Sequence, residues 1–535
     1  MDEIYDKISD PDLWGVDDSE VSEIQNFYAN KTIFFTGCTG FFGKSIIEKL
    51  LRACPKLKKI YLFVRPKKLS SKERIEKYFN DTIFDKIREL QPKFTSKVVI
   101  IEGNLESPNL GLSDDDKNII INEASIFIHN ASNVKFDIRV SQSLNCNVIG
   151  TKNMLDLATQ CKHLEVFVYV STAFSHCYEK HIYEKCYPPP CDMNMIYDLI
   201  DNDRAHTNGL SKTAITELTA PWPNIYAFSK AMAENLVEQY AKKSDFYCTI
   251  FRPSIILPSF QEPTSGWTDG NLNGPVVISI GTGLGLLHLG PSPLNNSLDM
   301  VPVDMCTNAL ISTTWATVTD KNKSDQVSVY NYASSVVNPI SLIQLGELGY
   351  AQGIDFPSNK MVGPLYFCST NWYTLFFIGS IFLLLIPGII GDIVLLLCGK
   401  KPLALSVARR AIPLIPDILY FSLLNNWRIH VHETTKVWDK MNKRDSELFF
   451  NDLRKLDWSI FCCYYWPSCR KYILKEPLST LKQAKKRFFI LQSAGKIFVI
   501  GVICLILYIF SNYLSLLLIP FINLIKLLNF FITKN

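Results

Sequence analysis

Short, continuously apolar runs alternate with longer stretches of helical periodicity over most of the first 335 residues. Runs of this kind, with few polar positions, are typical of strands buried on both faces of a parallel sheet. They occupy residues 32–35, 59–64, 98–101, 125–128, 166–170 and 248–251, with helical spacing between them, for example at 150–160 and 229–243. Strands alternating with helices predict an α/β domain built on a doubly wound parallel sheet over residues 31–335.

Beyond this domain the alternation stops, and we expect a mainly helical C-terminal domain over residues 336–487. Within it, residues 375–391 carry no charge and contain a Pro-Gly break at Pro387-Gly388. This apolar segment suits a re-entrant or interfacial hairpin or a wall of a pocket. Whether it spans, lies in or avoids a bilayer stays open.

The end of the chain has the pattern of a transmembrane helix. Residues 497–519 are uncharged throughout, which meets the length of about 20 residues that a helix needs to cross a bilayer. A short tail, 520–535, follows. Basic residues gather just before the apolar stretch, between Lys482 and Lys496, and by the positive-inside rule they predict that the N-terminal bulk faces the cytosol.

Residues 1–30 are polar and are expected to form a leader, with no pattern of a signal peptide. The 15 cysteines follow no regular spacing, which favours a reducing compartment over a disulfide framework. Aromatic residues at 12% argue against a disordered chain. A net charge of +4 is small for 535 residues and gives no case for a nucleic-acid partner.

A glycine-rich turn links the first predicted strand to the helix after it. Gly37, Gly40 and Gly43 suit, in that order, a sharp turn, close approach of a pyrophosphate and tight helix–strand packing. The N-terminus of the helix offers unpaired N–H groups to phosphate. The spacing GxxGxxG is common in short-chain dehydrogenases and predicts a dinucleotide site.

The end of the second strand indicates which dinucleotide binds. An acidic residue there holds the ribose of NAD, whereas cations suit the 2′-phosphate of NADP. This strand ends in Arg65, followed by Lys67 and Lys68, with no acid. Because arginine can bind phosphate through two hydrogen bonds, NADPH is favoured over NADH.

Tyr226 and Lys230 are four residues apart in a predicted helix and therefore share one face. An ammonium beside a phenol lowers the phenol pKa, which suits a general acid. Ser171 and Thr172 follow the strand at 166–170, at the edge where open α/β sheets bind ligands. Either hydroxyl could bind a substrate oxygen, and Thr172 is the favoured one.

These motifs, in this order, resemble those of alcohol-forming fatty acyl-CoA reductases, which are extended short-chain dehydrogenases with an additional C-terminal domain. The resemblance covers most of residues 30–335 and, more weakly, the C-terminal DSELFFNDLRKLDWSIF. Its segments are TGCTGFFGKSIIEKLLRACP, IYLFVRPK, LGLS, FIHNAS with VKFD, NVIGTKNML, VYVSTAF, PNIYAFSKAMAEN, FRPSII, EPTSGW and VPVDM.

The resemblance implies a Rossmann-type domain that reduces a long-chain acyl-CoA to a primary alcohol in two hydride steps from NADPH, through an aldehyde, with release of coenzyme A. Thr172 and Tyr226 would stabilise the oxyanion, with Ser171 as the less favoured alternative to Thr172. Tyr226 would also donate the proton, and Lys230 would hold the nicotinamide ribose. The expected cofactor-binding residues are Thr36, Gly37, Thr39, Gly40, Phe41, Gly43, Arg65, Lys67, Asn104 and Lys230. The expected location is an intracellular membrane, of the endoplasmic reticulum or a peroxisome, with the catalytic domain in the cytosol.

The sequence departs from the family pattern at two positions. Asn104 stands where the family usually has an aspartate near the adenine, and Ser132 replaces an alanine. Asparagine still offers hydrogen bonds, so the change would tune cofactor binding rather than abolish it.

Two other classes of function remain open: a membrane-bound steroid or sugar dehydrogenase or epimerase, and a non-catalytic nucleotide-binding scaffold. The first class would not be expected to carry EPTSGW, VPVDM and the long C-terminal domain. The second predicts loss of the catalytic residues, but Tyr226, Lys230 and Ser171 or Thr172 are all present. No metal site is expected, because His430 and His432 have no third ligand at suitable spacing. The oligomeric state and the preferred acyl chain are not predicted.

Overall fold

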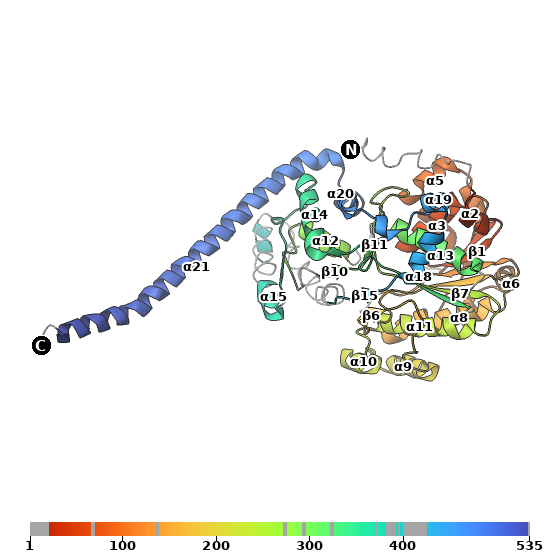
Figure 1. Cartoon of the computed structure of the whole chain (residues 1–535), viewed down its shortest axis with the longest axis horizontal. Helices are drawn as coiled ribbons and strands as arrows, with labels where there is room; N and C mark the ends of the chain where they lie inside the picture. Colours follow the sequence, from red (N-terminus) through yellow and green to blue (C-terminus); the bar gives the residue numbers. More distant parts are fainter. Residues whose placement is uncertain are drawn as a thin grey trace.

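The structure is a computed structural model of the whole chain (Figure 1). It describes residues 21–65, 70–134, 138–270, 275–291, 296–320, 326–370, 372–380 and 425–532, with a few positions between 389 and 399. Most of the apolar segment 375–391 lies outside the described residues; its first part forms helix α15 (Tyr373–Ser380).

A parallel sheet forms the centre of the molecule. In the described part of the chain it has seven strands in the order β12-β7-β5-β4-β1-β2-β3, all parallel. Their bounds are β1 Thr32–Thr36, β2 Lys59–Val64, β3 Val98–Glu102, β4 Ile126–His129, β5 Val166–Val170, β7 Tyr247–Pro253 and β12 Val327–Tyr332. The doubly wound Rossmann-type sheet is thereby confirmed.

Both faces of the sheet are buried because successive side chains of each strand point to opposite sides. In β1, Ile33 and Phe35 belong to one apolar core, whereas Phe34 belongs to the other. Helices α3 (Phe41–Ala53) and α13 (Val303–Thr319) pack on the first side, and α8 (Gly150–Ala158) and α11 (Ile225–Ala241) on the second. Figure 1 shows the two pairs above and below the strands.

Shorter elements surround this domain, and helices predominate after it. The remaining helices are α2 Glu23–Tyr28, α4 Ser71–Phe79, α5 Asp85–Leu90, α6 Asp114–Glu123, α7 Val140–Leu144, α9 Met193–Ala205, α10 Lys212–Thr219, α12 Pro275–Gly283, α14 Leu342–Asp355, α18 His432–Lys440, α19 Lys443–Leu448, α20 Trp458–Ser468 and α21 Leu481–Ile532. The small strand pairs are β6 His181–Ile182 with β15 Arg428–Ile429, β8 Ile255–Leu257 with β11 Met300–Pro302, β9 Leu289–Pro291 with β14 Cys368–Thr370, and β10 Ser297–Leu298 with β13 Ile340–Ser341.

The last part of the expected polar leader is ordered and packed. Ile24 and Tyr28 of α2 are fully buried. The buried carboxylate of Asp445 accepts hydrogen bonds from the Ser22 hydroxyl and from the amide of Glu23 at 3.1 Å. A carboxylate at a helix N-terminus stabilises the helix. The C-terminal region therefore holds α2 against the first domain, a long-range contact that a polar sequence pattern does not reveal.

A buried ionic cluster joins α3 to the loop after β8 and to the C-terminal region. The Lys49 ammonium lies 2.7 Å from the Glu262 carboxylate, and Arg52 donates to the same carboxylate at 2.9 Å. Asn308 on α13 bonds Glu262 at 2.7 Å and the Phe450 carbonyl at 3.0 Å. Burial alone would raise the pKa of Glu262, but Lys49 and Arg52 lower it to about 2.

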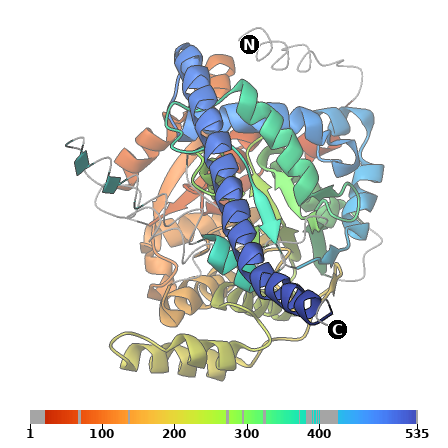
Figure 2. The same ribbon diagram turned by 90° about the vertical axis from the view of Figure 1, so that its left-hand side faces the viewer.

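The C-terminal helix α21 leaves the body of the molecule (Figures 1 and 2). Residues 478–511 include a window of mean hydropathy 2.3, none of it buried. By length and composition alone, this is one helix among the described residues that could cross a membrane. The helix also extends N-terminally well past the predicted span.

We expect Glu262→Ala to lower the free energy of unfolding by about 3–5 kcal/mol, because it leaves Lys49 and Arg52 buried without their shared partner. The carboxylate's pKa is depressed in the folded state, so its stabilisation is present above about pH 4.3, the ordinary glutamate value, and is lost as the pH falls toward 2. Thermal unfolding of the detergent-solubilised protein at several pH values measures both effects.

Glu238→Ala is the matched control for this prediction. Glu238 forms an i,i+4 pair with the exposed Lys242, and a surface pair of this kind contributes roughly 0.3–0.5 kcal/mol. Equal losses of stability in the two variants would show that the Glu262 cluster does not hold the domains together.

Candidate active site

The predicted hydroxyl residues lie at the carboxyl end of β5, where its neighbour β7 anchors them. The Ser171 amide donates to the Phe251 carbonyl at 2.8 Å, and the Ala173 amide donates to the Pro253 carbonyl at 2.9 Å. These bonds extend the β5–β7 pairing past the last strand residue. The side chain of Thr172, between them, is 7% exposed.

Helix α11 brings Tyr226 to the same place. Asn224 caps the helix, its side chain accepting from the Ala227 amide at 2.9 Å, so Tyr226 lies in the first turn. The Thr172 hydroxyl lies within hydrogen-bonding reach of the Tyr226 phenol and favours the charged form of that phenol. The structure thus joins two of the predicted catalytic residues, which are 54 positions apart in the chain.

Lys230 lies one turn further along α11 and is 2% exposed. Its ammonium donates to the Val170 carbonyl, the last of β5, at 2.7 Å and lies 4.8 Å from the centroid of the Tyr169 ring. Burial lowers the pKa of Lys230 to about 8. The ammonium therefore still carries its proton at neutral pH.

The expected lowering of the Tyr226 pKa is not found. Burial raises the pKa of the Tyr226 phenol well above its ordinary value, and the hydrogen bond with Thr172 offsets only part of this rise. The Lys230 ammonium donates to the Val170 carbonyl, so its charge is not directed at the phenol. Tyr226 consequently keeps its proton at neutral pH.

Beneath these residues lies a buried charged cluster that the sequence analysis missed. The Glu234 carboxylate accepts from Arg252 at 2.6 and 2.9 Å, lies 3.0 Å from Nε2 of His176, and accepts from the Ser171 hydroxyl. Burial would raise the pKa of Glu234, but Arg252 and His176 hold it well below the usual range. A sequence signal existed: Glu234 follows Lys230 by four residues, as Lys230 follows Tyr226.

A π-helical turn, η5 (Asn145–Ile149), provides a second link that the sequence analysis missed. The Asn147 amide group donates to the Ser229 hydroxyl on α11 at 2.9 Å, and its oxygen accepts from the Asn133 amide at 2.7 Å. Asn147 is 2% exposed. It connects the loop after β4 to the helix that carries Tyr226 and Lys230.

The glycine turn has the geometry of a dinucleotide cradle. A Cβ on Gly43 would lie 2.2 Å from the Gly37 carbonyl oxygen, and one on Gly37, whose φ is +78°, would lie 2.7 Å from the Ala131 nitrogen. Gly40, by contrast, has nothing closer than 3.5 Å and is exposed together with Thr39. The first turn of α3 has no side-chain cap, so its N–H groups are available for a phosphate.

Two of the predicted cofactor residues bond or pack within the protein. Thr36 is fully buried, and its hydroxyl lies 2.8 Å from Nδ1 of His129 and accepts from the Ala131 amide at 3.1 Å. Phe41 stacks on Trp267 with ring centroids 5.3 Å apart. Both residues stabilise the walls of the glycine turn.

An exposed cation follows the end of strand β2. The Arg65 side chain is 51% exposed and pairs with Glu106 at 3.1 Å, while Lys67 lies outside the described residues. Asn104 uses its side-chain oxygen to accept from the Glu106 amide at 3.3 Å. Arg74, which we had not singled out, donates to the Arg65 carbonyl. Burial raises the pKa of Cys38 in the glycine turn to about 12, and the charge of Arg74 offsets part of this rise. Two arginines thus lie beside the cradle.

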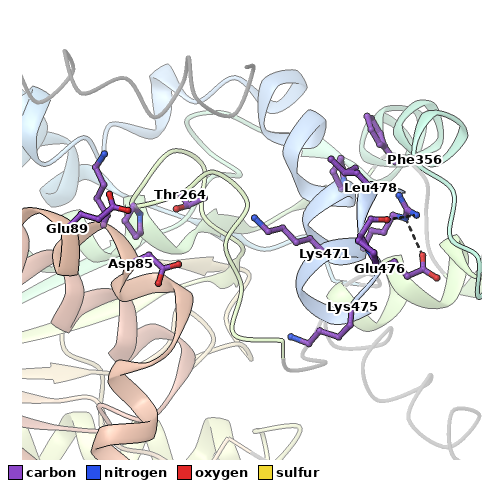
Figure 3. Close-up of a pocket in the computed structure, with 13 residues that line it drawn as sticks. Asp85, Glu89, Thr264, Phe356, Lys471, Lys475, Glu476 and Leu478 are labelled. Atoms are coloured by element: carbon purple, nitrogen blue, oxygen red, sulfur yellow. Dashed lines mark hydrogen bonds and ion pairs between the residues drawn. The ribbon is translucent and has the colours of Figure 1, made fainter. Parts of the chain in front are cut away.

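A separate cavity of about 790 Å³ lies away from these residues, between α5 and the segment after α20 (Figure 3). Asp85 and Glu89 line one wall, and Lys471 and Lys475 extend from the other. Its lining includes neither Tyr226 nor the glycine turn, so it is distinct from the site described above.

Comparison with known proteins gives the class of this site. Two family models, both described as male sterility protein, match residues 35–310, as an NAD-binding domain, and residues 383–476. Two solved structures share the fold. The terminal R domain of the myxalamid PKS-NRPS pathway has a TM-score of 0.53 and 18% identity, covering 83% of this chain and 91% of that one. The R domain of a Mycobacterium tuberculosis nonribosomal peptide synthetase has a TM-score of 0.54 and 15% identity, covering 86% of this chain and 97% of that one. The fold and site define a nicotinamide-dependent oxidoreductase.

Curated relatives identify the family to which this oxidoreductase belongs. Fatty acyl-CoA reductase wat of Drosophila melanogaster is 35% identical over 474 residues, covering 88% of this chain and 90% of its own. Fatty acyl-CoA reductase 1 is 34% identical in Rattus norvegicus and 33% in Homo sapiens, in each case covering 86% of this chain and 88% of the relative. The chain belongs to the fatty acyl-CoA reductase family.

The glycine geometry predicts different effects for two alanine substitutions in one motif. Gly40→Ala should leave stability unchanged, because its backbone (φ −81°) and surroundings accept a methyl group. It should weaken binding of the nicotinamide dinucleotide about tenfold or more by blocking the approach of the pyrophosphate. Gly43→Ala should lower the melting temperature, because its Cβ meets the Gly37 carbonyl. Thermal unfolding and fluorescence titration with NADPH measure the pair.

Wild-type NADPH affinity in Gly40→Ala would contradict this placement of the pyrophosphate. Wild-type stability in Gly43→Ala would show that the turn can relax around the added methyl group.

Proposed function

We propose that this protein reduces a long-chain fatty acyl-CoA to the primary alcohol with NADPH, releasing coenzyme A, in two steps through an aldehyde. The observation that carries the proposal is that the Tyr226 phenol and the Thr172 hydroxyl lie together at the carboxyl end of β5, with Lys230 one turn further along α11. Family membership supports the substrate class.

The cofactor would lie along the sheet edge from the glycine turn to Lys230. Gly37 and Gly43 pack closely against neighbouring backbone, whereas Gly40 has room for a ligand at the start of α3. This arrangement fits a dinucleotide. Bound NADPH supplies the hydride for each of the two reductions. Arg65 is the residue we assign to the 2′-phosphate, since a planar guanidinium suits a phosphate. Lys67 lies two positions further along the chain, and Asn104 follows the neighbouring strand β3.

Tyr226 and Thr172 would act on the carbonyl oxygen of the substrate. Both hydroxyls can donate hydrogen bonds to the oxyanion that develops at the thioester carbonyl, the kind of stabilisation that usually contributes most to catalysis. Expulsion of the coenzyme A thiolate then leaves an aldehyde. Because burial keeps the Tyr226 phenol protonated, it can give its proton to the alkoxide that the second reduction forms.

Lys230 and Ser171 would support this pair. The Lys230 ammonium is positioned to hold the nicotinamide ribose, and at neutral pH its charge also favours a nearby oxyanion. Ser171 is bonded to Glu234 rather than to Tyr226 or Thr172. We therefore assign it to the support of the β5 end and keep Thr172 as the oxyanion donor.

We also propose that α21 attaches the enzyme to an intracellular membrane, of the endoplasmic reticulum or a peroxisome, with the catalytic domain in the cytosol. Its apolar stretch follows a group of basic residues, as the positive-inside rule requires. The partners are then the acyl-CoA substrate and the bilayer itself.

Tyr226→Phe tests the function directly. The ring and its packing remain, but the proton and one oxyanion contact are lost, so reduction of acyl-CoA and of supplied aldehyde should both fall by roughly 10²–10⁴-fold. Purified membranes incubated with acyl-CoA or aldehyde and NADPH, with the alcohol quantified, give both rates.

Tyr240→Phe is the matched control, because Tyr240 lies on the same helix and its hydroxyl bonds Asp156 on α8. It should retain near-wild-type rates. Near-wild-type rates in Tyr226→Phe would remove the tyrosine from the proposed catalytic machinery and leave it a packing residue.

The cofactor assignment predicts that Arg65→Asp weakens NADPH binding selectively. A hydrogen bond to a charged group contributes about 1.5–3 kcal/mol, which corresponds to roughly 10- to 150-fold in the preference for NADPH over NADH. Kinetics with both cofactors measure the ratio. Arg204→Asp, at an exposed arginine of α9, is the control, and an unchanged ratio in Arg65→Asp would remove Arg65 from the site.

A further inference from the structure

Exposed apolar side chains concentrate in two stretches of the described chain. One is the exposed part of α21, and the other surrounds α15, far from it in sequence. In the second stretch Val362 is 57% exposed, Trp372 75%, Leu375 53% and Ile378 47%. Exposed apolar side chains that gather in one short stretch suggest an interaction site.

The two stretches are connected through the body of the protein. Phe488 of α21 is buried against Met361 and Leu365, and the Gln492 side chain donates to the Leu365 carbonyl at 3.0 Å. Residue 365 precedes Trp372 by only seven positions. Figures 1 and 2 show α15 on the side of the body from which α21 departs.

The same part of α21 carries both charge and exposed apolar residues. Lys482, Lys485, Lys486 and Arg487 lie in its first two turns, and Phe489 and Ile490 are 64% and 68% exposed. A surface hollow of about 690 Å³ is lined by Lys486, Arg487, Ile490 and Leu491 together with Asn359 and Gln483. Cations beside apolar side chains suit the headgroup layer of an anionic membrane.

We propose that the exposed side chains of Trp372, Leu375 and Ile378, here called the α15 surface, form a second membrane contact that lies in the interfacial layer of the leaflet that α21 enters. Tryptophan favours that layer because one end of its ring system is apolar and the other can bond water. The proposal rests on the proposed membrane attachment by α21. Its consequence is that the body is held against the leaflet at two points.

The contact also places β9 and β14 toward the membrane. Helix α15 packs on β9, with Gly379 against Leu289, and β9 pairs with β14. Long-chain acyl-CoA partitions to membrane surfaces because of its apolar tail. The second contact therefore directs the enzyme to substrate collected from the leaflet.

Lipid photolabelling of the full-length protein tests the α15 surface. The protein is placed in vesicles of phosphatidylcholine and phosphatidylserine with a trace of phosphatidylcholine bearing a diazirine in its acyl chain. After irradiation, labelled peptides are identified by mass spectrometry. We expect label on the peptide containing residues 372–380 as well as on 497–511, and none on α9 and α10, which expose Tyr197 and Leu218.

A pair of double variants sharpens the test. Trp372→Glu with Leu375→Glu should lower labelling at 372–380 about tenfold, the effect of a loss of 1.4 kcal/mol in contact free energy, while label on 497–511 persists. Tyr197→Glu with Leu218→Glu should leave both signals unchanged. Labelling of the wild-type protein at 497–511 but not at 372–380 would overturn the second contact. A protein partner that covers this surface would produce that same labelling pattern.

Turnover of acyl-CoA and NADPH is measured in the same vesicles. Failure of the proposed function can then be distinguished from failure of the second membrane contact. Label at 372–380 without any turnover supports the contact and counts against the proposed function. Turnover without label at 372–380 supports the proposed function and overturns the contact.

Discussion

A single buried carboxylate, Glu234, holds the parts of the candidate active site together. It lies on α11, two turns after Tyr226, and bonds the Ser171 hydroxyl after β5, Arg252 on β7 and His176 in the loop between. Arg252 extends the network to the carbonyls of Tyr183 and Lys185 at 3.0 Å. Removing one partner from such a buried pair leaves an uncompensated charge, so these segments cannot separate independently.

The central sheet was largely predictable because its strands are buried on both faces and therefore read as continuous apolar runs. The bounds of β2 and β5 agree with the prediction, and β1, β3, β4 and β7 differ by one or two residues at their ends. The edge strand β12 was missed because Ser328 and Asn331 interrupt its apolar pattern. Helix α2 was missed for a different reason: its stability comes from Asp445, more than 400 positions away.

The candidate site was predictable where spacing along one element determines geometry. The spacing of four positions from Tyr226 to Lys230 placed both on one face of α11, and the strand-end position of Thr172 brought it to Tyr226. Burial was not predictable from spacing, and it decides the pKa of Tyr226, which rises instead of falling. The environment of Thr36, bonded to His129 across the sheet, likewise depends on tertiary contacts.

The continuity of α21 gives the molecule a defined rotational setting. Two side chains of its first part bind the segment before α15: Gln492 donates to the Leu365 carbonyl, and Arg487 donates to the Met361 carbonyl at 2.6 Å. The helix then continues into its exposed apolar part without interruption. Each residue of a helix turns its axis by about 100°. The number of residues between the two parts, and not only their chemistry, therefore sets how the catalytic body is rotated about the axis of the exposed apolar part. An insertion or deletion of one residue there would turn the body by about 100° about that axis.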